Sequence, residues 1–383
     1  MSVNYIKFFK FIVSTQYGYT AEKTFLENGD AKYLRITDIV PYFVDKDSVP
    51  YCEIEQKRKE QYLVKAGDLL IARTGATTGY NLLVDESFVN YVFASYLIRF
   101  NYDKDKLAPL YVKYVLKSQQ WYGFVNNYIG GSAQPGMNAK TFGRFDFPYF
   151  EKNYQQKIAG ILSKYDEAIE NNNKRIKLLE QMAQNLYKEW FVRFRFPGWQ
   201  RAEFENGIPK GWKVEKLGNL FERLPFGRTY KKEDLEKEGS VIVIDQSTDD
   251  YLGFHNDEPA YKANFESPMI LFGDHTCKFV LMTRDFSLGE NIIPIKPRNC
   301  NPYYLFRSID GIIKTTEYKR HWSILITQKI FIPSENLQNK FGEVYRSFIK
   351  QIENLTQQTQ NLSRQRDLLL PRLMSGKLQV FRK

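Results

Sequence analysis

The side chains best suited to chemistry lie in short, glycine-flanked loops. Residues 73–80 offer a cation, three hydroxyls and a phenol, and residues 130–140 add two amides and a lysine. Arg, Gln and Asn can pair bidentately with the edges of DNA bases, whereas Ser, Thr and Lys more often hold phosphates. These residue types favour nucleic-acid binding. The candidate DNA-contacting residues are Arg73, Thr74, Thr77, Thr78, Tyr80, Gln134, Asn138 and Lys140.

The second half of the chain carries comparable polar loops. Residues 245–247 and 253–257 are rich in Asp, Asn, Gln, Ser and His, and residues 319–322 combine two cations with a histidine and a tryptophan. For each of these side chains, an ordinary solvated loop is the alternative interpretation. The candidates in this half are Arg228, Gln246, Ser247, His255, Lys319 and Arg320.

No catalytic motif accompanies these loops. Residues 75–79 lack the lysine of a phosphate-binding loop, and the three histidines have no metal-ligand spacing. Residues 301–304 are close to the N-P-P-Y/F motif of amino-methyltransferases but lack its second proline, so we interpret Asn301 as a helix cap and Pro302 as the first turn. The sequence predicts no catalytic residue, metal or cofactor. The alternative is a methyltransferase or nuclease with an unrecognised site.

Composition favours a polyanionic partner and a cytoplasmic location. The 383 residues include 55 Lys and Arg against 44 Asp and Glu, a net charge of +11. This length predicts two domains. The three scattered cysteines give no disulfide framework. We find no run of about 18 apolar residues, which a membrane-spanning helix would need.

Two segments carry the same helical pattern. Ile169-Glu170-Asn171 recurs 183 positions later as Ile352-Glu353-Asn354, and apolar residues follow a 3,4 spacing through both segments. This spacing is typical of coiled-coil helices, and occasional polar seam residues usually fix register or partner. Two unrelated amphipathic helices would not share one offset. The predicted seam residues are Leu162, Tyr165, Ile169, Asn172, Ile176, Leu179 and Leu186, with Tyr345, Phe348, Ile352, Leu355, Leu362 and Leu369.

The rest of the chain forms two halves with short, mixed elements. We predict strands at 32–40, 68–72, 91–100 and 241–245 and a helix at 110–118. Residues 17–20 are echoed by 226–229, and Phe147-Pro148 by Ile332-Pro333. The predicted fold class is mixed α/β: two globular domains, each followed by a long helix, the helices forming an antiparallel coiled coil with pseudo-two-fold symmetry. The predicted segments are 1–150, 151–195, 196–335 and 336–383.

Several motifs resemble a known family. The stretches IAGILS at 158–163 and LLEQMAQNLYKEWFV at 178–192 look like the central conserved helix of type I restriction–modification specificity subunits. GIPKGWK at 207–213 resembles the opening of the second target-recognition domain in that family, and LLLPRLMSGKL at 368–378 its C-terminal end. KAGDLL at 65–70, followed by Arg-Thr-Gly at 73–75, is similar to the recognition-domain pattern. The resemblance spans nearly the whole chain and is strongest in the helices.

This resemblance implies a non-catalytic subunit that reads a bipartite target on double-stranded DNA. Its partners would be modification subunits that methylate adenine with S-adenosylmethionine, and restriction subunits that cleave DNA using ATP and Mg. Those cofactors would belong to the partners. One departure is the N-terminus, where the Pro-x-Gly-Trp opening seen at 209–212 has no counterpart. Two interpretations are open: the entry to the first domain is truncated, or the start codon lies further upstream.

Overall fold

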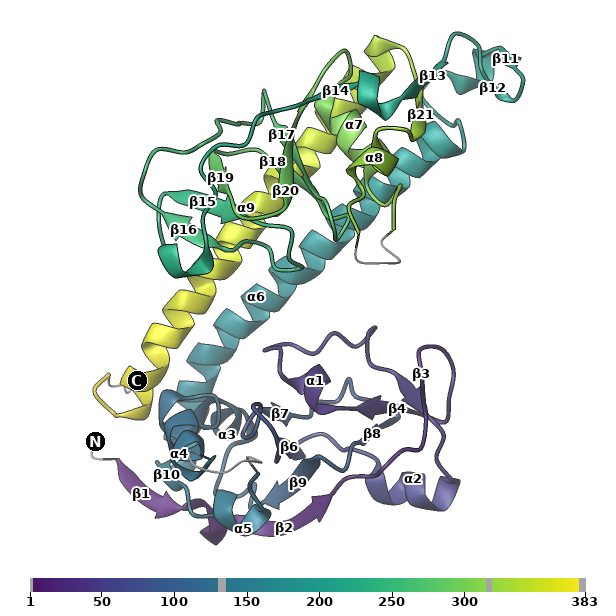
Figure 1. Cartoon of the computed structure of the whole chain (residues 1–383). Helices are drawn as coiled ribbons and strands as arrows, with labels where there is room; N and C mark the ends of the chain where they lie inside the picture. Colours follow the sequence, from purple (N-terminus) through teal and green to yellow (C-terminus); the bar gives the residue numbers. More distant parts are fainter. Residues whose placement is uncertain (1–2, 130–135, 315–318, 379–383) are drawn as a thin grey trace. The chain divides into compact units, whose positions relative to one another are not determined.

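The chain forms two compact units. The computed structural model describes residues 3–129, 136–314 and 319–378. The first unit comprises Met1–Asn173 with Gln357–Lys383, and the second comprises Lys174–Thr356. The division falls inside both long helices, α6 (Lys152–Tyr187) and α9 (Glu335–Met374), so each unit contains a segment of each helix (Figure 1).

The first unit is built from two four-stranded sheets and a two-stranded ribbon, with strand orders β2-β9-β6-β7, β3-β5-β4-β8 and β1-β10. Strands β4 and β8 are parallel, and the other pairs are antiparallel. The strands are β1 Asn4–Lys7, β2 Ile12–Tyr17, β3 Thr24–Phe25, β4 Ala31–Leu34, β5 Tyr51–Cys52, β6 Leu69–Ala72, β7 Asn81–Leu83, β8 Tyr91–Phe93, β9 Leu97–Tyr102 and β10 Asp146–Tyr149. The short helices are α1 Ile36–Ile39, α2 Gln56–Tyr62, α3 Pro109–Val115, α4 Gln119–Ile129 and α5 Ala139–Phe142.

The second unit repeats this topology. Its sheets have the orders β14-β20-β17-β18, β16-β15-β19 and β13-β21, with β15 and β19 parallel, and a small β11-β12 hairpin precedes them. The strands are β11 Phe204–Glu205, β12 Ile208–Pro209, β13 Lys213–Lys216, β14 Phe221–Arg223, β15 Val241–Ile244, β16 Gly253–His255, β17 Met269–Gly273, β18 Phe279–Met282, β19 Phe286–Leu288, β20 Ile292–Pro297 and β21 Lys329–Ile332. The short helices are α7 Pro302–Ile309 and α8 Trp322–Leu325.

A buried glutamine at the start of each long helix joins that helix to its globular part. Gln155 accepts a hydrogen bond from the backbone N–H of Ala108 (2.8 Å) and donates to the carbonyl of Phe150 (2.7 Å). Its counterpart Gln338, 183 positions later, accepts from the N–H of Asn301 (3.0 Å) and donates to a carbonyl before α9. Both glutamines are nearly fully buried, so they satisfy backbone groups that water cannot reach. The duplication therefore extends to individual polar contacts.

Within each unit, α6 and α9 bury their apolar stripes together. In the first unit Leu162 of α6 shares a core with Leu373 of α9. In the second, the ring of Tyr187 lies 6.1 Å from that of Phe341, and Phe191, in the π-helical turn Lys188–Val192 that continues α6, lies 5.1 Å from it. All of the predicted seam residues are buried or half-buried. The mixed α/β class and the two long helices are confirmed.

Three local predictions are wrong. The strand predicted at 32–40 ends at Leu34 and gives way to α1, because the Asp38 carboxylate accepts a hydrogen bond from the Arg35 N–H (2.8 Å) and caps a helix there. The strand predicted at 91–100 is two strands, β8 and β9, which belong to different sheets. Phe147-Pro148 is not equivalent to Ile332-Pro333. The 183-residue offset instead pairs β10 with β21 and Phe150 with Pro333.

The interpretation of Asn301 as a helix cap is confirmed. Its side-chain oxygen accepts hydrogen bonds from the N–H groups of Tyr303 (3.1 Å) and Tyr304 (3.3 Å), and Pro302 opens α7. Tyr304 is buried, and its hydroxyl donates to the carbonyl of Phe331. A methyltransferase motif would need this ring free to stack on a base, so the residues serve the core.

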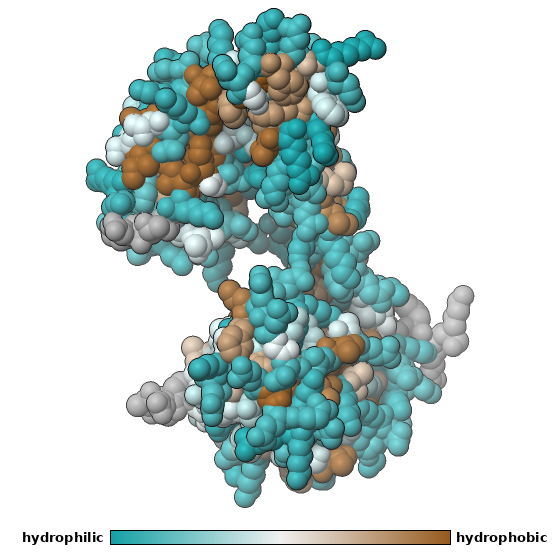
Figure 2. Space-filling view, turned by 90° about the vertical axis from the view of Figure 1, so that its right-hand side faces the viewer, coloured by the Kyte–Doolittle hydropathy of each residue, from teal (hydrophilic) through white to brown (hydrophobic). Residues whose placement is uncertain are grey.

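Surface hydropathy is mixed in both units. On the face seen in Figure 2, hydrophilic side chains interrupt the exposed apolar ones. Among the residues that the structure describes, no helix is both long and apolar enough to cross a membrane.

Replacing either buried glutamine should destabilise the protein. Gln155→Leu and Gln338→Leu each strand a buried N–H and a buried carbonyl, so each should lower the free energy of unfolding by about 1–3 kcal/mol. Urea unfolding followed by circular dichroism measures this. The exposed Gln181→Leu on α6 is the matched control. Losses no larger than that of the control would contradict the role assigned to the two glutamines.

Candidate nucleic-acid interface

In the first unit, two of the predicted polar segments lie side by side. The loop between β6 and β7 pairs with the segment before α5: Thr74 bridges Gly136, and the carbonyl of Arg73 accepts a hydrogen bond from the N–H of Met137 (2.8 Å). The guanidinium of Arg73 donates to the carbonyl of Ser95 (3.2 Å) and lies over the exposed ring of Tyr17 (5.1 Å). Backbone pairing therefore holds a cation and an exposed aromatic ring together at this surface.

The other candidates in this unit differ in exposure. Lys140 and Asn138 are exposed, but the Asn138 oxygen caps α5 by accepting from the N–H of Thr141 (2.9 Å). Thr77 is half-buried. Tyr80 is half-buried as well, with its ring 5.6 Å from that of Tyr122.

Thr78 is buried in the loop between β6 and β7. Thr78 is only 3% exposed, and its hydroxyl donates to the carbonyl of Gly75 (2.7 Å). The structure thus corrects its proposed role: Thr78 closes the turn instead of facing a ligand. Gln134 lies outside the described residues.

In the second unit, three polar loops converge at the end of β17. The Asp274 carboxylate accepts hydrogen bonds from the N–H groups of His321 (3.0 Å) and Trp322 (2.9 Å), just before and within α8. The side-chain oxygen of Gln246 accepts from the N–H of His275 (3.1 Å). Arg320 is exposed, 3.9 Å from the Asp274 carboxylate, and Lys319 is exposed beside it. The basic pair and Gln246 are thereby assembled around one aspartate.

His255 does not fit the role predicted for it. It is 5% exposed and stacks on Tyr230 with ring centroids 4.3 Å apart. Its Nδ1 accepts from the N–H of Asp257 (3.1 Å), so Nε2 carries the proton and donates to the Ser287 hydroxyl (2.9 Å). With both nitrogens engaged inside the fold, His255 is a core residue.

The two remaining candidates make local contacts. The Ser247 hydroxyl donates to the Asp245 carboxylate (2.6 Å), which forms a tight turn after β15. Arg228 is exposed, lies over the ring of Tyr230 (4.5 Å) and forms an ion pair with Asp257 (3.3 Å). An exposed ion pair of this kind is weak, so the guanidinium can exchange Asp257 for a phosphate at small cost.

Exposed aromatic residues were missed by the sequence prediction. Tyr17 and Phe226 occupy echoed positions, and each carries an arginine over its ring at 5.1 Å, Arg73 in the first case and Arg223 in the second. The echo between residues 17–20 and 226–229 was the available signal. It marked the repeat but gave no indication that these rings are exposed.

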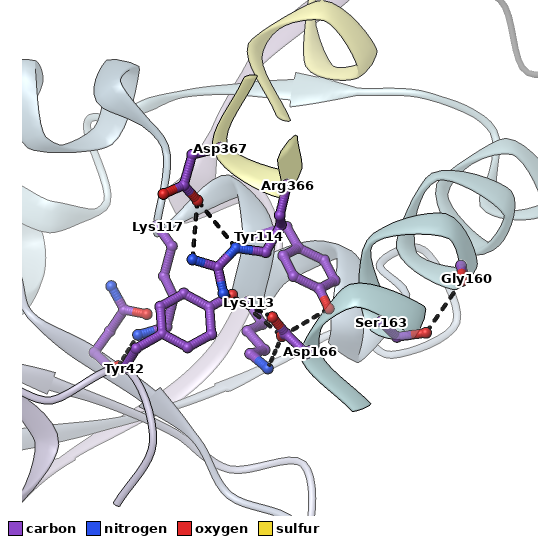
Figure 3. Close-up of polar contacts among 10 residues, drawn as sticks. Tyr42, Lys113, Tyr114, Lys117, Gly160, Ser163, Asp166, Arg366 and Asp367 are labelled. Atoms are coloured by element: carbon purple, nitrogen blue, oxygen red, sulfur yellow. Dashed lines mark hydrogen bonds and ion pairs between the residues drawn. The ribbon is translucent and has the colours of Figure 1, made fainter. Parts of the chain in front are cut away.

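A charged cluster joins α3, α6 and α9 in the first unit (Figure 3). The Asp166 carboxylate of α6 accepts from Lys113 (2.6 Å), from the hydroxyls of Tyr114 (2.9 Å) and Tyr42 (3.1 Å), and from the Arg366 guanidinium of α9 (2.9 Å). Burial raises the pKa of Asp166, but the charge and hydrogen bond of Lys113, with the hydrogen bonds of Arg366 and Tyr114, outweigh it and hold the pKa below its usual range. The carboxylate therefore stays ionised although it is 6% exposed.

A cavity of about 630 Å³ adjoins this cluster. Tyr80 of the candidate loop lines it, together with Lys117, Tyr122 and Arg366. Burial, followed by the charge of Lys113, lowers the pKa of Lys117 to about 8. The wall of the cavity therefore includes a lysine whose charge is costly to bury.

Comparisons with known proteins agree with this architecture. Residues 11–181 match the family described as the type I restriction modification DNA specificity domain. The type I restriction enzyme MjaIX specificity subunit of Methanocaldococcus jannaschii is 27% identical over 316 residues, covering 72% of this chain and 71% of that protein. The HindI specificity subunit of Haemophilus influenzae is 26% identical over 151 residues, 38% of this chain and 33% of that protein. The crystal structure of a type I S subunit from M. genitalium has the same fold, with a TM-score of 0.61 at 18% identity over 97% of this chain and 96% of that one.

The fold and these matches define a specificity protein built from a duplicated α/β scaffold. Residues 11–181 belong to the type I restriction modification DNA specificity domain family, and 72% of the chain is similar to a type I specificity subunit. Members of this family supply DNA specificity and are non-catalytic.

The half-buried position of Lys117 should make stability depend on pH. Because its folded pKa of about 8 is below the unfolded value of 10.5, the unfolded chain binds more protons between these values, and this group's contribution to stability should rise across that window. Lys117→Met removes the contribution, so its gain in melting temperature over the parent protein should shrink between pH 7 and pH 10. Thermal unfolding at both pH values measures this, with the exposed Lys164→Met as control. A difference in melting temperature between Lys117→Met and the parent that is the same at both pH values would refute this prediction.

Proposed function

We propose that this chain reads a bipartite DNA sequence and docks the modification subunits that methylate it. Residues 1–150 and 196–335 act as the two target-recognition domains, and residues 151–195 and 336–383 as the conserved helices that join them and present docking surfaces. The protein itself performs no chemistry. It works in the cytoplasm with modification subunits that use S-adenosylmethionine and restriction subunits that use ATP and Mg.

One observation carries this proposal: the same scaffold presents different side chains in its two copies. The loop after β6 pairs with the segment before α5, and the loop after β17 contacts the segment before α8 in the corresponding place. In the first copy these segments carry the half-buried Arg73 and the exposed Asn138; in the second the equivalent positions hold the buried Asp274 and His321, and the exposed Lys319 and Arg320 come just before His321. Equivalent frames with unlike polar surfaces are what two different half-sites require, because base edges are read by side-chain identity.

The proposed contacts divide by chemistry. Arg73 has guanidinium donors that can read base edges. Gln246 and Asn138 offer their amide N–H₂ groups, since the oxygen of each accepts a backbone N–H inside the fold. Lys140, Lys319 and Arg320 would hold phosphates. Tyr17 and Phe226 offer exposed aromatic faces next to arginines, which suits packing against sugars or thymine methyl groups.

Exchanging one recognition segment should change one half of the target. Residues 200–335 are replaced by the matching segment of a relative, and the chain is expressed with its modification subunits. Methylome sequencing should then show one new half-site and one unchanged half-site, because the first-unit loops are untouched. Changes in both half-sites, or in neither, would sink the modular assignment.

Removing the Arg73 guanidinium should weaken recognition at a single half-site. Arg73→Ala should reduce the binding free energy for the recognition sequence by about 1–3 kcal/mol, which is about tenfold to hundredfold in affinity. Base selectivity should be relaxed at one position of that sequence. Arg58→Ala, an exposed arginine on α2, is the matched control. Gel shifts of the assembled complex at fixed salt measure both variants, with melting temperatures checked in parallel. An equal effect of the two variants would count against a base-reading role for Arg73.

A further inference from the structure

Among the residues that the structure describes in the second unit, the charged cluster around Asp166 has no counterpart, although the scaffold is duplicated. The 183-residue offset places Ile349 where the first unit has Asp166, and Ala183 where it has Arg366. The offset is anchored on both sides by the equivalent hydrogen bonds of Gln155 and Gln338.

The residue of the globular part that contacts Asp166 also differs between the two units, and its counterpart in the second unit is apolar. The hydroxyl of Tyr111 donates to the carbonyl of Pro148, and that of Tyr304 to the carbonyl of Phe331, so α3 and α7 correspond at an offset of 193 residues. Phe306 therefore stands where the first unit has Lys113. Phe306, Ile349 and Ala183 all belong to the apolar core of the second unit or pack against it. One seam is thus ionic and the other apolar at equivalent positions.

This difference has a consequence for pairing. Because the two long helices are related by the repeat, α6 could pair with α6 of a second copy, and α9 with a second α9, through the same seam. In the chain itself, Arg366 of α9 faces Asp166 of α6. If α6 paired with α6 of a second copy, Asp166 of one helix would face Ala183 of the other. If α9 paired with a second α9, Arg366 of one helix would face Ile349 of the other. Arg366 would then enter the place of Ala183, which is 4% exposed among apolar side chains. A buried charge without its partner is strongly destabilising.

We propose that the Asp166–Arg366 pair is a pairing-specificity element, which directs α6 to the α9 of its own chain and disfavours exchange with a second copy. An apolar pair would hold the helices together equally well but would not discriminate between them. Buried polar groups that cost stability and fix partner choice are known from coiled coils. Lys113 and Tyr42 add to this pairing specificity, because their hydrogen bonds to Asp166 join the ion pair to the globular part of the first unit.

The test makes the two seams alike in the full-length chain. Asp166→Ile with Arg366→Ala installs the second-unit residues in the first unit. Arg366→Met alone keeps the side-chain bulk, and Asp166 retains Lys113 and the two tyrosine hydroxyls. Each protein is unfolded in urea and refolded at a series of concentrations. Light scattering after size exclusion gives the dimer fraction, and mixing of two differently tagged copies before refolding reports exchange. Lys164→Ala, which removes an exposed ion pair, is the control.

We expect the dimer fraction and the tag exchange of both seam variants to rise by about threefold or more over the parent protein, because the discriminating charge is gone. The control should match the parent. If either seam variant regains the parent's circular dichroism and still shows the parent's oligomer distribution at every concentration, the proposal is overturned. Arg366→Met keeps the test decisive if the double variant does not refold.

Discussion

An apolar stripe on a long helix must be covered, and the rest of each unit depends on how that is done. Helices α6 and α9 carry stripes with the spacing of a coiled coil, and neither can bury its stripe alone. In each unit a segment of one helix packs against a segment of the other, and the globular part completes the core around them. The sheets, loops and candidate contacts are therefore positioned relative to a helix pair that the burial requirement creates.

Rigidity passes from the helices to the loops through a few buried polar contacts. Gln155 and Gln338 tie the helix starts to the segments just before α3 and α7. Backbone pairing then joins the loop after β6 to the segment before α5, and the Asp274 carboxylate joins the loop after β17 to α8. Because these joints are made by backbone groups and by residues outside the exposed positions, the exposed side chains can vary without loss of the frame.

Sequence reasoning succeeded where the signal was periodic and failed where it was local or three-dimensional. The seam residues follow from helical spacing, and every one of them is buried or half-buried. The break at Leu34 was missed because it depends on one carboxylate, Asp38, which a β-rich pattern does not reveal. The candidate DNA contacts were chosen by residue type alone. That criterion cannot separate exposed Arg320 from buried His255 and Thr78, whose polar atoms are satisfied inside the fold.

Duplication explains why the one ionic seam matters. Two helices with equivalent seams can pair within one chain or between two copies unless their seam residues differ. Apolar side chains of similar size make little difference between these pairings. In the described residues, the two units differ at this seam position: the first has Asp166 and Arg366, and the second has Ile349 and Ala183. The ionic side needs Lys113, Tyr42 and Tyr114 to keep its charges satisfied, so the first globular part had to diverge with it. Specificity of assembly and the different cores of the two units are therefore two results of the same substitutions.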